Sequence, residues 1–419
     1  MQATSGGIDF GTSNSTVGYA VGGQPRLVAL DAGQVTMPSA IFFDFEEDRT
    51  FFGRTAIGRY TENVEGRLLR ALKSVLGSSL IHEKTRIKAH SIAFSDIIGS
   101  FLLNLKEKLE EGRGAPVDNI VLGRPVHFVD DDAAADSRAQ DELESAARRR
   151  GFRNIAFQFE PIAAALDYER QVAREELALI VDIGGGTSDF SIVRVSPERA
   201  KSAERKDDIL ASHGVHIGGT DFDRLLSIAR LMPELGYGTP TKDGKRNLPV
   251  GYYNDLATWQ RIHLLYTARA MGDLRQIRYE AARPDLVERM IAIVAERRGH
   301  AAAALVEKAK IALTSQPETT IEIALPDERL AVPVTQAQMN EAIAATVERV
   351  RRAVADTLAS AGVEREQVTA LFLTGGSTAV PLLNSSIRQM FPSASVVDGD
   401  MFGSVGLGLA LDAWRKFEG

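Results

Sequence analysis

The stretch VDIGGGTSDF, residues 181–190, decides the fold, because three consecutive glycines lie in it between Asp182 and Asp189. Glycine loses more backbone freedom on folding than any other residue, so three in succession indicate a turn that needs them. Apolar residues precede the turn and alternating residues follow it, which predicts a β-hairpin with the glycines at its tip. Backbone N–H groups at such a tip can approach an anion closely, so the stretch predicts a phosphate-binding turn.

The same pattern occurs near the N-terminus, in GIDFGTSNSTVGYAV, residues 7–21. There Asp9 ends the first strand, and a turn with Thr12, Ser13 and Asn14 follows it. Such a repeat predicts two related lobes whose hairpin tips face one another and hold a polyphosphate from both sides. The two aspartates would repel phosphate unless a Mg²⁺ ion lay between them, and Mg²⁺ favours carboxylates, phosphate oxygens and water.

The composition is that of a globular chain too long for a single hydrophobic core. It has 419 residues, of which 44% are hydrophobic and 25% are charged, with a net charge of -7 and no cysteine. Two lobes or domains are therefore expected. The negative charge argues against nucleic-acid binding, the lack of cysteine excludes disulfides, and no apolar run reaches the length of a membrane span. We expect a cytoplasmic protein with no nucleic-acid or membrane partner.

Two shorter motifs extend this site. In QFEPIAAALDYE, residues 158–169, Pro161 predicts an extended Glu160 followed by a helix. A carboxylate placed there can orient or deprotonate a water molecule that attacks a terminal phosphate. The alternative is an acidic residue that only interacts with the helix dipole. The stretch LFLTGGSTAVPLL, residues 371–383, predicts a strand, a paired-glycine turn and a helix; the turn can approach a base or sugar, or be an ordinary β-to-α connection.

The order and wording of six motifs resemble the nucleotide-binding domain of the DnaK-type heat-shock chaperones, members of the actin-like ATPase superfamily. IDFGTSNS is similar to the first phosphate motif of that family and VDIGGGTSDFSI to the second. The other four are FEPIAAALDY, similar to the connecting motif, IGGTDFD, which follows the second hairpin, and VEKAKIALTS and LTGGSTAVP, which resemble the two segments around the adenosine.

The resemblance implies an actin-like fold of two α/β lobes, each with an RNase-H-like core and an inserted subdomain, and a nucleotide cleft between them. We expect the first lobe at residues 1–172, with its insertion at about 34–114, and the second at 173–419, with its insertion at about 232–298. The final helix, residues 403–418, is expected to pack back toward the first lobe. Because the chain ends at Gly419, we expect no peptide-binding domain and a closer likeness to stand-alone YegD-like proteins.

The same resemblance assigns roles to individual residues. It implies that Asp9 and Asp182 hold a Mg²⁺ ion through water, with K⁺ nearby, and that Glu160 polarises the attacking water close to Asp189. These four carboxylates would form the catalytic set. It further implies that ATP or ADP is held by Gly11, Thr12, Ser13, Asn14, Gly184, Gly185, Gly186, Thr187, Gly218, Gly219, Glu307, Lys310, Thr314, Gly375, Gly376 and Ser377.

One departure from the family affects the expected rate of ATP hydrolysis. A motif resembling FFGRTAIGRY, residues 51–60, carries the catalytic lysine of the family, and Ile57 takes the aligned position here. Arg54, Arg59 or the more distant Lys73 would have to replace it. We therefore expect a slow Mg²⁺-dependent ATPase, related to chaperones, whose lobe closure is coupled to an unknown protein partner.

Three alternatives remain open at this point: a nucleotide sensor or scaffold that does not hydrolyse ATP, a small-molecule kinase of the same superfamily, and a filament-forming protein. A second open question is the aromatic group in the second insertion, namely Tyr252, Tyr253, Trp259 and Tyr266. Core packing is the expected role of these side chains, and a partner-binding face is the alternative.

Overall fold

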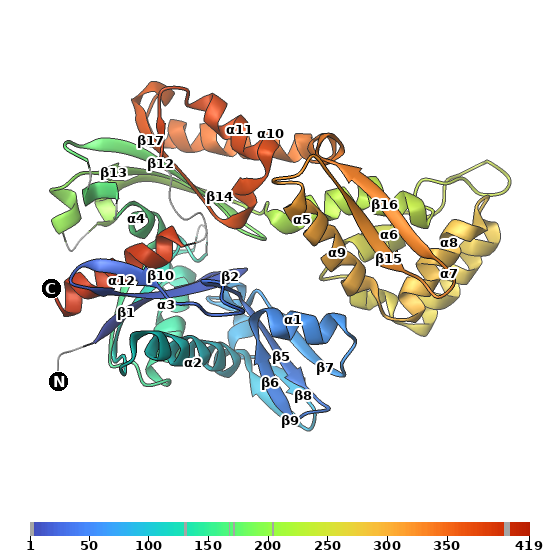
Figure 1. Cartoon of the computed structure of the whole chain (residues 1–419), viewed down its shortest axis with the longest axis horizontal. Helices are drawn as coiled ribbons and strands as arrows, with labels where there is room; N and C mark the ends of the chain where they lie inside the picture. The colour runs from blue at the N-terminus through green and yellow to red at the C-terminus, as the bar shows by residue number, and fades with distance from the viewer. Residues whose placement is uncertain (1–3, 130–131, 167, 171, 203–204, 398–402) are drawn as a thin grey trace.

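The computed structural model describes residues 4–129, 132–166, 168–170, 172–202, 205–397 and 403–419, which form two α/β lobes (Figure 1). The sheet of the first lobe has the strand order β11-β10-β1-β2-β3, with β4 also paired to β2. These strands are β1 (Ser5–Phe10), β2 (Asn14–Val21), β3 (Gln24–Leu27), β4 (Thr36–Pro38), β10 (Asn119–Arg124) and β11 (Asn154–Phe159).

The sheet of the second lobe repeats this plan with the order β14-β13-β12-β17-β18. Both sheets contain an antiparallel hairpin, β1-β2 or β12-β13, whose first strand also pairs in parallel with a later strand, β10 or β17. The two predicted hairpins and the internal repeat are therefore confirmed. The strands are β12 (Glu176–Ile183), β13 (Ser188–Val195), β14 (Ile209–Val215), β17 (Val368–Thr374) and β18 (Ser395–Val396).

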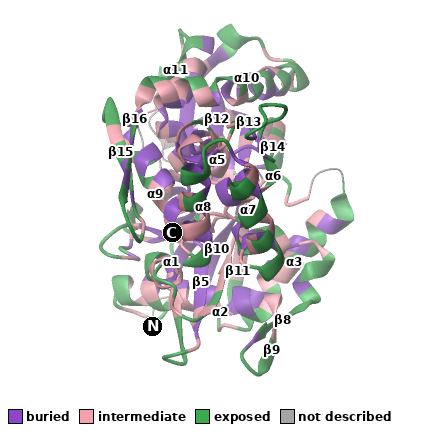
Figure 2. Cartoon of the chain, turned by 90° about the vertical axis from the view of Figure 1, so that its right-hand side faces the viewer, coloured by how far each residue is buried: buried purple, intermediate pink, exposed green. Residues whose placement is uncertain are grey.

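Helices cover these sheets and exclude water from them. Figure 2 shows that buried residues follow the central strands, whereas exposed residues gather on the outer surface of helices such as α10. The helices that pack around the two sheets are α2 (Phe94–Arg113), α3 (Ala133–Arg148), α4 (Glu160–Ala165), α5 (Gly219–Leu226), α10 (Gln336–Ala361), α11 (Pro381–Met390) and α12 (Ser404–Phe417).

The last helix, α12, contacts β1 and β2 of the first lobe and also α4. Gly7 makes this approach possible, since a Cβ atom at that position would lie 2.4 Å from the backbone nitrogen of Ala410. The segment thus returns from the end of the second lobe to the sheet of the first. Where each lobe begins and ends along the chain stays a prediction.

Smaller elements between β4 and α2 form one inserted region, and those between α5 and α10 form another. The first contains β5 (Ala40–Asp44), β6 (Arg49–Phe52), α1 (Gly53–Thr61), β7 (Gly66–Arg70), the short 3₁₀ turns η1 (Leu72–Val75) and η2 (Ser79–His82), β8 (Lys84–Ile87) and β9 (His90–Ala93). The second contains α6 (Gly251–Ala257), η8 (Ile262–Leu265), α7 (Ala268–Glu280), α8 (Pro284–Ala295), α9 (Gly299–Ala312), β15 (Glu318–Ala324) and β16 (Arg329–Thr335).

Core packing in the second insertion accounts for part of its aromatic group. Tyr253 is 1% exposed and belongs to the large core cluster of the second lobe, as expected. Tyr252 and Tyr266 are half-buried against the same cluster. Among the described helices, none combines the length and the apolar composition needed to cross a membrane.

Candidate functional site

The tips of the two hairpins touch each other. The backbone N–H of Gly185 donates to the hydroxyl of Ser13 over 3.1 Å, although the two residues are 172 positions apart. A Cβ atom at Gly185 would lie 2.2 Å from that oxygen, so the glycine leaves space for the opposite hairpin. The predicted arrangement, with one tip facing the other, is confirmed.

Backbone contacts brace the second tip from the side. The carbonyl oxygen of Gly184 accepts from the N–H of Gly219 at 3.0 Å and from the Ser377 hydroxyl at 2.9 Å. Gly218 packs so closely that a Cβ atom there would lie 2.4 Å from the carbonyl carbon of Gly185. Two segments that are distant in sequence from the tip, at residues 218–219 and at Ser377, therefore support it.

A cleft of about 960 Å³ opens around these tips. Its size is within the range of small-molecule and cofactor sites. Gly218, which lies behind the second tip, is absent from its lining. The other residues assigned to the site do line it, namely Asp9, Gly11, Thr12, Ser13, Asn14, Glu160, Asp182, Gly184, Gly185, Gly186, Thr187, Asp189, Gly219, Glu307, Lys310, Thr314, Gly375, Gly376 and Ser377.

Glu160 lies at the strand-to-helix junction that Pro161 predicted, directly after β11. The expected extended backbone of Glu160 is wrong, however, because α4 already begins at Glu160 and the extended residue is Phe159 before it. Its Oε1 atom lies 2.5 Å from the Nζ of Lys73, which comes from the 3₁₀ turn η1 of the first insertion. Burial alone would lower the pKa of Lys73, but the charges of Glu160 and Asp9 outweigh it and raise the pKa above its ordinary value. Lys73 is therefore a stable cation in the lining of the cleft.

Two further carboxylates face this ion pair. Burial, together with the charge of Glu160, raises the pKa of Asp9 to about 8 and that of Asp182 to about 6. The raised values mean that these carboxylates lack sufficient positive charge around them. Their oxygen atoms suit hydrated Mg²⁺, which keeps several waters and takes few protein ligands. Among the described residues, no group of three His, Cys, Asp or Glu side chains that could hold a metal ion is present.

Ile57 supplies no cation, but one of the three residues expected to replace the lysine reaches the site. Ile57 does line the cleft, but so does Lys73, whose ammonium group already pairs with Glu160. Arg54 and Arg59 instead pair with Asp31 and Asp44, within the first lobe. The sequence left Lys73 as one of three candidates, because its approach to Glu160 is a contact between residues 87 positions apart.

A second group of charges lies elsewhere in the same cleft. The Nζ of Lys310 lies 2.9 Å from Asp223 and donates to the carbonyl oxygen of Gly219 at 3.2 Å. Burial raises the pKa of Asp223 to about 6, against the opposing effect of Lys310. Glu307 and Arg70 line the cleft beside them. Asp223 and Arg70 were not predicted; the position of Asp223 in IGGTDFD was the available signal.

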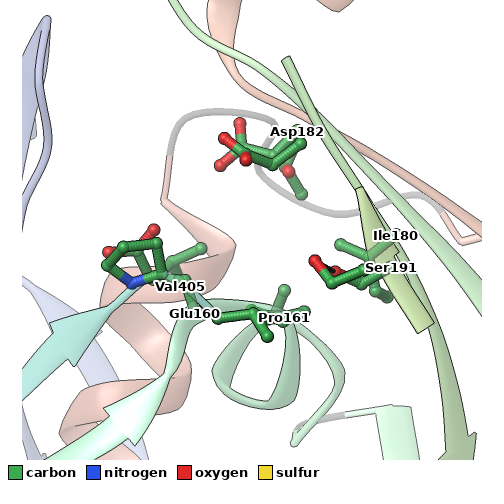
Figure 3. Close-up of a pocket in the computed structure, with 12 residues that line it drawn as sticks. Glu160, Pro161, Ile180, Asp182, Ser191 and Val405 are labelled. Carbon is green, nitrogen blue, oxygen red and sulfur yellow. Dashed lines mark hydrogen bonds between the residues drawn. The ribbon is translucent and has the colours of Figure 1, made fainter. Parts of the chain in front are cut away.

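A small cavity of about 20 Å³ lies behind the first group of charges. Glu160 and Pro161 from α4, Asp182 from β12 and Ser191 from β13 line it together with Val405 (Figure 3). This volume has room for about one water molecule, which needs roughly 10–15 Å³ on this measure.

The comparison with protein families agrees with this geometry. A family model described as Hsp70 protein matches residues 6–232 and 297–413, which is most of the chain. The match covers both hairpins, Lys73, Glu160 and the segments that brace the second tip, and it leaves out residues 233–296 of the second insertion. The two lobes therefore have the actin-like ATPase fold. The chain belongs to the Hsp70 family and contains its ATP-binding domain.

Proposed function

We propose that the chain binds ATP with Mg²⁺ between its lobes and hydrolyses it, with water as the acceptor. The observation that carries this proposal is the Lys73–Glu160 pair, 2.5 Å apart, beside Asp9 and Asp182 in the cleft where the two hairpin tips meet. A glutamate, a cation and two metal-binding carboxylates are the groups that phosphoryl transfer to water requires.

Each residue then has a defined task. Glu160 orients the water and accepts its proton, while Lys73 holds Glu160 in place and donates to the transferring phosphoryl group. The hairpin tips, with Thr12, Ser13 and Thr187, surround the phosphate chain. Asp9 and Asp182 would hold Mg²⁺ through water, and that ion would supply neutralisation of charge on the phosphates.

Hydrolysis is favoured over the alternatives by Lys73. The expectation of slow turnover rested on a missing cation, and that reason disappears because Lys73 pairs with Glu160. A sensor that never hydrolyses ATP would have no need of this pair. We also propose that closure of the lobes is coupled to a protein partner, and that the chain resembles YegD-like members of the family.

A single-turnover experiment with limiting radiolabelled ATP, Mg²⁺ and K⁺ tests the proposal. Wild type, Glu160→Gln and the exposed control Glu107→Gln are compared, with nucleotide binding measured on the same samples. We expect hydrolysis in wild type and in the control, and a loss of roughly 100-fold or more in Glu160→Gln without loss of binding. Tight binding without hydrolysis by wild type would instead identify a sensor, and phosphate transfer to an added small molecule would identify a kinase.

A further inference from the structure

Side chains from the two insertions meet beside the nucleotide cleft. Tyr60 on α1 and Arg70 on β7 belong to the first lobe; Trp259, just after α6, and His300 on α9 belong to the second. The ring centroids of Tyr60 and His300 are 4.7 Å apart, and the Arg70 guanidinium lies 4.7 Å from the centroid of Trp259. Figure 1 shows α1 next to α9, where these insertions approach each other.

The geometry of these contacts is favourable. Tyr60 and His300 meet edge to face, as do Trp259 and His300, whose centroids are 4.9 Å apart. Such pairs contribute stabilisation beyond the area that they bury, and a cation over an indole ring adds to it. A polar contact accompanies them, because the side-chain amide of Asn63 donates to the carbonyl oxygen of Glu296 at 3.2 Å.

On the second lobe, a hydrogen bond holds Trp259 and His300 in place relative to each other. A ring nitrogen of His300 lies 3.1 Å from the backbone oxygen of Trp259, and His300 is only 5% exposed. The two rings therefore form a fixed surface on which Tyr60 and Arg70 rest. Separation of the insertions would break the contacts of Tyr60 and Arg70 but keep this surface intact.

Arg70 connects the contact to the nucleotide cleft. It lines the cleft with Glu307 and Asp223, and both acids raise the pKa of Arg70 against the larger lowering effect of burial. One face of its guanidinium thus lies on Trp259 while the group stays within the field of these acids. Arg70 therefore joins the second group of charges, which Lys310, Asp223 and Glu307 form on the second lobe, only when the two insertions are in contact.

Family membership does not supply this contact. Trp259 lies in residues 233–296, the segment that the Hsp70 family model leaves unmatched. We propose that Tyr60, Arg70, Trp259 and His300 form a cross-lobe clasp, which holds the cleft closed and sets how long a nucleotide stays bound. In this clasp Arg70 is a positioning residue for the nucleotide. The proposal rests on nucleotide binding as proposed above.

The rate of nucleotide release tests the clasp. A fluorescent ADP is bound with Mg²⁺ and chased with unlabelled ADP, using wild type, Tyr60→Ala, Trp259→Ala and the control Tyr279→Ala, whose tyrosine is 73% exposed on α7. We expect release to be roughly 5- to 20-fold faster in the two clasp variants and unchanged in the control. Tyr60→Ala keeps the test valid if Trp259→Ala fails to fold. Release at the wild-type rate from Tyr60→Ala would overturn the clasp.

Arg70 needs a test that separates positioning from chemistry. In Arg70→Gln we expect weaker nucleotide binding and faster release, with a smaller loss in the single-turnover hydrolysis of pre-bound ATP. Arg70→Lys keeps a cation over Trp259 and should restore slow release in part. Equal effects of Arg70→Gln and Arg70→Lys, or a loss confined to the hydrolysis step, would contradict a positioning role.

A crosslinking experiment separates failure of the clasp from failure of the proposed function. The chain has no cysteine, so Asn63→Cys with Glu296→Cys introduces the only two thiols, one on each side of the contact. A short bismaleimide should join them efficiently in the wild-type background, less in Tyr60→Ala, and should slow ADP release at least several-fold. If wild type binds no nucleotide, the proposed function fails, and the crosslink yield alone decides the clasp. An equal yield with and without Tyr60 would overturn it.

Discussion

The cleft contains two buried lysine–carboxylate pairs that are similar in distance and different in setting. Lys73 and Glu160, 2.5 Å apart, come from an inserted turn and from the start of α4, and further carboxylates surround them. Lys310 and Asp223, 2.9 Å apart, both come from helices of the second lobe, and Lys310 also bonds to the backbone of Gly219. Around the first pair, carboxylates outnumber cations, whereas the lysine of the second pair is also hydrogen-bonded to the backbone that lines the cleft.

This difference indicates separate roles for the two lysines. A lysine that is surrounded by several carboxylates can also interact with a bound metal–phosphate group. The metal ion then supplies the positive charge that the carboxylates lack, and the lysine can donate to the phosphate. A lysine that already forms an ion pair with a carboxylate and donates to a carbonyl oxygen mainly stabilises the shape of the site. We therefore expect loss of Lys73 to affect hydrolysis most and loss of Lys310 to affect binding and stability most.

The largest effect is expected for Lys73→Met. Removing a preorganised cation beside the transferring phosphoryl group should slow single-turnover hydrolysis by roughly 100- to 1,000-fold. Lys84→Met, at an exposed lysine of β8 in the same insertion, is the matched control and should hydrolyse ATP normally. Hydrolysis by Lys73→Met within a few-fold of wild type would show that the two pairs are equivalent.

The next effect is on stability, in Lys310→Met. Because this change leaves Asp223 buried without its partner, we expect the free energy of unfolding to fall by about 3 kcal/mol, with weaker nucleotide binding. Lys308→Met is the control, since Lys308 is exposed on the same helix, α9. Denaturant unfolding and equilibrium binding give the two readouts. A variant as stable as the control would contradict the structural role of Lys310.

A smaller effect is expected from pH, which should change the rate of ADP release through His300 of the clasp. Burial in the closed state lowers the pKa of His300 to about 4. When the insertions separate, this pKa should rise toward the ordinary value of about 6.5, so the open state binds the proton more strongly. Lowering the pH therefore favours opening, and ADP release should be up to roughly tenfold faster at pH 5.5 than at pH 7.5.

The control for this pH effect is His300→Gln, which keeps a hydrogen-bonding group and removes the titration. The groups that face His300 are the guanidinium of Arg70, the imidazole of His263 and the phenols of Tyr60 and Tyr266. Measuring ADP release across pH in both proteins isolates the contribution of His300 from that of the carboxylates in the cleft. The same pH slope in both would remove His300 from the clasp.

The smallest effect is expected for Ile57→Lys. Since Lys73 already supplies the cation beside Glu160, a second lysine in the cleft should change single-turnover hydrolysis by less than about threefold. A much faster reaction would show that Lys73 does not serve the phosphoryl group, and that the position of Ile57 limits the rate.

The local pattern of residues was sufficient to predict the parts of the site that lie on the backbone. Glycine turns between alternating strands can form only a narrow set of hairpins, so the two hairpins and their aspartates followed from residues 7–21 and 181–190. Pro161 favours the first turn of a helix, which placed Glu160 at the junction, although Glu160 is the first helical residue and not the extended one.

Contacts between distant segments were decided by tertiary structure alone. Lys73 reaches Glu160 from a 3₁₀ turn that begins after Ala71, whose φ of 55° is in the left-handed region. Likewise, nothing near Trp259 in the sequence indicates that Tyr60, 199 positions earlier, packs against the same histidine. A short motif describes backbone conformation, because that depends on neighbours in the chain. The partner of a long side chain depends instead on how the lobes and their insertions pack, and only the folded structure determines that.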